Sequence, residues 1–145
     1  MPATTPLKKM IFTNYKNNIP RVTIQVIKTS GKKEEIGFLY KDSILDSGSN
    51  IISVPEDIAK WLNFVVKKEE RETETAKGKI TEHVQITDRF CFNIIDINGV
   101  SVRYDNERAR VAPSDTEILI GTIPIFRDFN IVIKASEKLT VLLPK

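Results

Sequence analysis

Short segments in which apolar and polar residues alternate constrain the fold of this chain more than any other feature. Residues 21–27 read RVTIQVI, an alternation that is typical of a strand with one buried face. Turn residues at 30–33 separate this segment from a second extended segment, residues 35–45. We expect further short strands at residues 90–97, 100–104, 111–112, 118–120, 131–133 and 139–143. The pattern predicts a mostly β fold with one or two short helices.

A helical pattern begins after residue 52. Ser53 and Glu56 have the spacing of a capping box, and Pro55 suits the first turn of a helix. One face of this helix is expected to pack inward through Ile58, Trp61 and Leu62. Asn63 is the expected end of the helix.

Two hairpins are predicted in the second half of the chain. Residues 69–82 are almost entirely polar, with threonines at alternate positions and one glycine, Gly78, which indicates an exposed hairpin. The Asn98-Gly99 pair suits a two-residue turn between the strands predicted at 90–97 and 100–104.

Length and composition favour one soluble globular domain. The chain has 145 residues, of which 41% are hydrophobic and 28% are charged. No stretch approaches the roughly 20 apolar residues of a membrane helix, so we expect no membrane partner. The amino end has no apolar run of signal-peptide length, and the lone Cys91 cannot form an internal disulfide, which favours the reducing cytoplasm. Residues 1–19 could form a loosely held extension.

The net charge of +3 does not by itself indicate a nucleic-acid partner. It is the small excess of 22 basic over 19 acidic residues. The lysine doublets are separated along the chain, at 8–9, 32–33 and 67–68. We therefore interpret the charge as solvated surface and expect no nucleic-acid partner, with a small nucleic-acid-binding barrel as the third hypothesis.

The stretch SILDSGSNII, residues 43–52, places an acid and a flexible turn between two apolar runs. Asp46-Ser47-Gly48 alone could be a plain loop in which the aspartate caps its own backbone. The apolar pairs 44–45 and 51–52, however, predict a carboxylate held in a shielded place, and such burial costs free energy unless the charge has partners. About seventy residues later, residues 118–121 (ILIG) again run from apolar side chains into glycine.

In this order, these segments resemble the retropepsin-like aspartic protease family, the single-domain relatives of pepsin that include retroviral proteases. The family pattern of two apolar residues, Asp, Ser or Thr, Gly and a small residue is met by residues 44–49. The resemblance covers about residues 20–143, and its remaining parts are an apolar stretch and helix (51–62), a flap hairpin (70–84), two apolar residues with glycine (119–121) and a last strand (139–143). It implies that residues 1–145 form one domain with a closed β-barrel, one or two short helices and a flap hairpin.

The resemblance implies an aspartic endopeptidase that is active as a homodimer. Such enzymes need two carboxylates that share one proton, one to activate a water molecule and one to donate a hydrogen bond to the scissile carbonyl. This chain holds a single Asp-Ser-Gly triplet, so each subunit would contribute one Asp46. The substrate would be a protein or peptide, and the reaction would need no metal or other cofactor.

The resemblance also assigns supporting roles. Ser47 would hydrogen-bond across the catalytic pair, and Gly48 would let the backbone approach the partner chain without a Cβ. Ser49 and a flap tip formed by residues 76–78 (Ala76, Lys77 and Gly78) would contact an extended peptide. This tip is more charged and poorer in glycine than is usual in the family.

Other chemistries find less support. His83 is the only histidine, which leaves neither a Ser-His triad nor a His-rich metal site within one chain, and we interpret it as a surface residue. Cys91 is interpreted as a strand residue. The glutamates at 69, 70, 72 and 74 are explained as charges on a solvated hairpin rather than as metal ligands. The main rival is a non-catalytic module that keeps the retropepsin fold for dimerisation or peptide binding.

Overall fold

The computed structural model describes residues 9–30, 34–49, 51–99 and 101–145. The strands are β1 (Ile11–Lys16), β2 (Ile19–Ser30), β3 (Glu34–Leu45), β4 (Ile52–Pro55), β5 (Val66–Thr75), β6 (Gly78–Thr87), β7 (Phe90–Ile95), β8 (Ser101–Glu107), β9 (Ala109–Ala112), β10 (Leu119–Ile120), β11 (Phe129–Lys134) and β12 (Leu139–Pro144). The helical segments are α1 (Glu56–Trp61) and the short turns η1 (Thr122–Phe126) and η2 (Ala135–Glu137). The prediction of a mostly β fold is confirmed.

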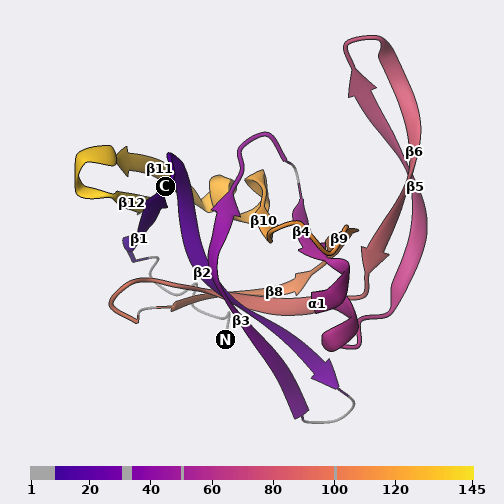
Figure 1. Cartoon of the computed structure of the whole chain (residues 1–145), viewed down its shortest axis with the longest axis horizontal. Coiled ribbons are helices and arrows are strands. Elements are labelled where there is room, and N and C mark those ends of the chain that lie inside the picture. The colour runs from indigo at the N-terminus through magenta and orange to yellow at the C-terminus, as the bar shows by residue number, and fades with distance from the viewer. Residues whose placement is uncertain (1–8, 31–33, 50, 100) are drawn as a thin grey trace, which may run out of the picture.

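The strands form one sheet in the order β11-β12-β1-β2-β3-β10-β4-β9-β6-β5, with β7 joined to β2 and β8 (Figure 1). The predicted closed barrel is not confirmed, because within the described part of the chain the two ends of this order, β11 and β5, do not pair. The register explains why the sheet stays open. Strand β6 pairs with β9 at Ile86 and Arg110 alone, so the rest of the β5–β6 hairpin projects away from the sheet (Figure 1).

Strand β2 organises the core. Its residues pair with β3 along one edge and with β7 along the other, so its middle is enclosed on both sides. Val22, Ile24 and Val26 are at most 1% exposed, and they are joined in one cluster by the fully buried Phe92 and Ile94 of β7. This continuous apolar cluster supplies the main stabilisation of the sheet.

Residues 11–16 are more ordered than the sequence suggests. Residues 11–16 form β1, which pairs with both β12 and β2, and Ile11 is fully buried. The expected loose extension over residues 1–19 is therefore wrong for residues 11–16, since this strand pairs with a neighbour on each side. Residues 1–8 lie outside the described part of the chain.

The helix α1 forms as predicted but is not capped as predicted. Ser53 lies in β4, where it faces Leu119 across the ladder, and the helix begins after Pro55 without a side-chain cap. The capping box is therefore wrong, because Ser53 already belongs to the sheet. Ile58 and Leu62 are buried, whereas Trp61 is 58% exposed. Trp61 thus does not belong to the inward face, and its ring meets Phe38 edge-on with the centroids 5.3 Å apart.

Asn63 ends α1 as predicted, with a φ of 56° that is typical of the residue after a helix. The β7–β8 connection is longer than the predicted two-residue turn, since the last pair of the ladder is Ile95 with Ser101. The buried Asp96 explains this loop: its carboxylate accepts hydrogen bonds from the backbone of Asn98 at 2.5 Å and of Phe12 at 3.2 Å. The loop is therefore tied to β1 as well as to itself.

Candidate active site

Asp46 begins the turn that connects β3 to β4. Its backbone N–H donates a hydrogen bond to the carbonyl of Ile120 at 2.9 Å, which ties the turn to β10. Its carboxylate Oδ1 accepts the backbone N–H of Gly48 at 2.9 Å, and its carbonyl accepts the N–H of Ser49 at 3.3 Å. Main-chain groups therefore hold both the backbone and one carboxylate oxygen of Asp46.

Strand β10 lies between the two strands that flank this turn (Figure 1). It runs parallel to β3, with Leu119 opposite Ile44, and antiparallel to β4, with Leu119 opposite Ser53. The N–H of Ile44 donates to the carbonyl of Ile118 at 2.9 Å, so β10 supplies hydrogen bonds both before and at Asp46. The two apolar segments that the sequence analysis singled out thus meet at one place.

Gly121, the residue after β10, packs directly against the backbone of the Asp46 turn. A Cβ at this position would lie 2.4 Å from the carbonyl oxygen of Ser49 and 2.8 Å from the nitrogen of Ile51. The following residue, Thr122, donates its N–H to the same Ser49 carbonyl at 2.7 Å. Because only hydrogen fits in this space, Gly121 belongs to the site, although the sequence indicated it only as part of an apolar-glycine motif.

The turn is less shielded than expected. Leu45 and Ile52 on either side are buried, at 4% and 2% exposure, but Asp46 itself is half-buried and Ser47 and Gly48 are exposed. In the part of the chain that the structure describes, no other acid hydrogen-bonds to Asp46. One chain therefore presents one partly exposed acid on a hydrogen-bonded turn.

The predicted supporting residues of the turn differ in what their side chains do. Ser49 uses its hydroxyl to donate a hydrogen bond to the carbonyl of Ile51 at 2.9 Å, which closes the turn. Ser47 lies exposed at the tip of the turn, and Gly48 contributes its backbone N–H to the Asp46 carboxylate.

The predicted flap is the β5–β6 hairpin, and its tip stands clear of the Asp46 turn (Figure 1). Ala76 and Lys77 form the exposed turn, and Gly78 has a φ of 111°, which suits glycine. The hydroxyl of Thr75 donates to the carbonyl of Gly78 at 2.8 Å and accepts the N–H of Lys77 at 3.2 Å. The structure thus does not bring residues 76–78 together with residues 46–49.

The base of this hairpin is firmly attached. Asp88 exchanges backbone and side-chain hydrogen bonds with Val65, at 2.8 and 3.1 Å, and forms an ion pair with Lys28. Burial lowers the pKa of Lys28. Arg108 pairs with Glu69, and its hydrogen bond holds the pKa of that carboxyl below its usual value. The hairpin therefore has a fixed base and a tip whose hydrogen bonds stay within the hairpin.

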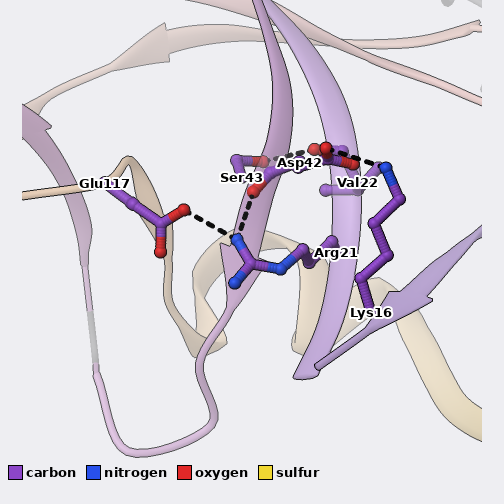
Figure 2. Close-up of polar contacts among 6 residues, drawn as sticks. All are labelled: Lys16, Arg21, Val22, Asp42, Ser43 and Glu117. Atoms are coloured by element: carbon purple, nitrogen blue, oxygen red, sulfur yellow. Dashed lines mark hydrogen bonds and ion pairs between the residues drawn. The ribbon is translucent and has the colours of Figure 1, made fainter. Parts of the chain in front are cut away.

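A polar cluster that includes the end of β3, shortly before Asp46, was not anticipated from the sequence. It consists of Lys16, Arg21, Asp42, Ser43 and Glu117, drawn in Figure 2. The one signal in the sequence is the arginine at the start of the apolar segment 21–27, but nothing local identifies its partner 96 residues away. Burial, together with the charge of Glu117, raises the pKa of the neighbouring Tyr40.

The remaining candidates behave as surface or strand residues. His83 is exposed, with Nδ1 3.9 Å from Oε1 of Glu70, and Cys91 is a buried residue of β7, as predicted. Among the residues that the structure describes, no three histidines, cysteines or acids are grouped so that they could hold a metal ion. Within the same residues, no helix combines the length and the apolar character needed to span a bilayer.

The contact at Gly121 generates a stability prediction. Gly121→Ala should lower the free energy of unfolding by about 2–3 kcal/mol, because the new methyl group meets backbone atoms that cannot move independently. The matched control is Gly37→Ala, whose Cβ would meet only the flexible side chain of Gln25, at 3.3 Å. Urea unfolding monitored by circular dichroism measures both variants, and equal losses would contradict the role given to Gly121.

Comparisons with known proteins add one structural likeness. No family model matches the chain, and no curated protein matches it. The chain is similar to the crystal structure of a retropepsin-like aspartic protease from Rickettsia conorii, with 15% sequence identity, a TM-score of 0.46, and coverage of 92% of this chain and 90% of that chain. At this level of similarity, neither activity nor site residues transfer from that protein to this one.

Proposed function

We propose that this chain is an aspartic endopeptidase that acts as a homodimer and hydrolyses peptide bonds with water activated by two Asp46 carboxylates, one from each subunit. The observation that carries the proposal is the meeting of the Asp-Ser-Gly turn with β10 and Gly121. It fixes the backbone of Asp46 through the carbonyl of Ile120 and leaves the carboxylate accessible.

The chemistry follows from bringing two such turns together. Two carboxylates in contact cannot both be ionised, so one proton is shared between them. The ionised carboxylate accepts a proton from water, while the protonated one donates a hydrogen bond to the scissile carbonyl. In each chain the N–H of Gly48 already occupies Oδ1. The other oxygen, Oδ2, is then the one available to share the proton.

The exposure of the turn supports a twofold arrangement. Ser47 and Gly48 are exposed in the single chain, so a second copy can approach the carboxylate from their side. An isologous contact would place the same residues opposite one another. For a peptide substrate, the tip of the β5–β6 hairpin would have to swing over the turn, and its attached base would act as the pivot.

Replacement of the proposed catalytic residue is the direct test. Asp46→Asn should lower kcat for cleavage of a peptide library by about 100-fold or more, because an amide cannot share or transfer the proton. Asp115→Asn is the matched control, since Asp115 is an exposed acid outside the site. Equal cleavage by wild type and Asp46→Asn, measured by mass spectrometry at acidic and neutral pH, would remove Asp46 as the catalyst.

Mixing the two proteins tests whether the site is shared between subunits. When wild type and Asp46→Asn are mixed in equal amounts and exchange subunits, total activity should fall to about a quarter of that of the same total amount of wild type, since only dimers with two aspartates are active. Independent subunits would retain about half. Sedimentation over a concentration series provides the oligomeric state, and an active monomer would contradict the dimer.

A second candidate is a non-catalytic module that uses the same fold for dimerisation or peptide binding. The hydrogen bond from Gly48 to Asp46 favours it to some extent, because an aspartate with a purely structural role makes the same contact. A transition-state mimic of peptide hydrolysis separates the two candidates. An enzyme should bind the mimic at least about 100-fold more tightly than the matching peptide, and Asp46→Asn should abolish that preference. Calorimetry that finds no preference would favour the module.

A further inference from the structure

Strand β3 contains an irregularity close to the Asp46 turn. Val22 of β2 pairs with Ser43, but Ile24 pairs with Tyr40, so one residue of β2 faces two residues of β3. The second of these two residues of β3 is Asp42, which has a φ of 62°. This is a β-bulge, which turns backbone groups out of the regular ladder and re-aims the strand that follows it.

Arg21 occupies the space beside this bulge (Figure 2). Arg21 is 8% exposed. Its Nη1 donates hydrogen bonds to the carbonyl of Asp42 at 2.9 Å and to Oε1 of Glu117 at 2.8 Å. The hydroxyl of Ser43 donates to the carbonyl of Val22 at 2.6 Å. The carbonyls of Asp42 and Val22 thus have hydrogen-bond donors, and a charge-assisted hydrogen bond links the bulge to a distant segment.

The distant segment is the one that holds Asp46. Glu117 directly precedes Ile118, whose carbonyl accepts the N–H of Ile44, and the carbonyl of Ile120 then accepts the N–H of Asp46. Strand β10 is only two residues long, so its own ladder offers few contacts that could define its position along β3. The Arg21–Glu117 pair adds a fixed point at the entrance of this strand.

We propose that Arg21 is a positioning residue for Asp46. By joining the β3 bulge to Glu117, its guanidinium sets the register of β10 against β3, and thereby the position of the Asp46 carboxylate relative to a second copy. This inference rests on the proposed function, since the position of Asp46 affects turnover only if Asp46 is catalytic. Displacement of a catalytic group by about 1 Å can cost up to about 100-fold in rate.

Glu117→Ala is the main test variant, because it removes the carboxylate that accepts from Arg21, while the carbonyl of Asp42 still accepts from the same Nη1. Its kcat should fall about 10-fold or more with an unchanged KM, measured well below its melting temperature. Arg21→Lys should act in the same direction, since lysine keeps the charge but loses the planar group. Glu137→Ala is the matched control: the side chain of Glu137 is 61% exposed and pairs with Lys134 at 3.9 Å. This control should leave kcat unchanged.

A second measurement does not depend on turnover. The amide protons of Ile44 and Asp46 donate to carbonyls of residues 118 and 120, so their hydrogen exchange should be faster in Glu117→Ala than in wild type or in Glu137→Ala. Nuclear magnetic resonance of the 145-residue chain resolves these two amides individually. A merely structural ion pair would speed the exchange of these amides at most and would leave kcat unchanged.

The outcomes separate the two proposals. If Asp46→Asn is inactive while Glu117→Ala and Arg21→Lys keep the wild-type kcat, the positioning role is overturned and the proposed function stands. Faster exchange with an unchanged kcat, or a raised KM alone, also overturns the positioning role. If the wild type cleaves nothing, or if Asp46→Asn cleaves equally well, the proposed function fails and the role of Arg21 in catalysis fails with it.

Discussion

The insertion of β10 between β3 and β4 is the constraint on which the rest of the site depends. It requires that backbone from residue 121 come into contact with backbone from residues 49 and 51, which is possible because Gly121 has no side chain. Once this contact is made, the carbonyls of Ile118 and Ile120 define where Ile44 and Asp46 lie. The backbone of Asp46 is thus held by a segment far away in sequence, whereas the carboxylate is oriented by the local N–H of Gly48.

The sequence predicted the parts of the site that depend on residues close to one another along the chain. Alternation indicated most of the strands, and the Asp-Ser-Gly turn was correctly expected between two buried segments. It did not predict which residues distant in sequence come into contact. The contact between Arg21 and Glu117 joins residues 96 apart, and neither residue stands in a recognisable motif. Nor could alternation predict the bulge at Asp42, because an extra residue in one strand is defined only by the partner strand.

Three of the wrong predictions have a common physical cause, which is that contacts between residues distant in sequence override local preference. Ser53 has the right spacing to cap α1, yet it is committed to β4. Residues 11–16 were not predicted as a strand from their own sequence, and they form one because they pair with both β2 and β12. The turn at Asn98-Gly99 is enlarged because Asp96 is needed to hold β1. In each case a contact distant in sequence decides the local structure.

The open ends of the sheet bear on how the molecule avoids unwanted association. Strand β5 pairs only with β6 within the described residues, so its outer edge offers unpaired backbone groups to any passing strand. Most of its side chains are charged, and lysine, arginine and glutamate there would be costly to dehydrate against another edge. The charged residues of β5, which could suggest a metal site, thus disfavour pairing of this exposed edge with a strand of another molecule. They thereby disfavour fibrous aggregation through the projecting hairpin.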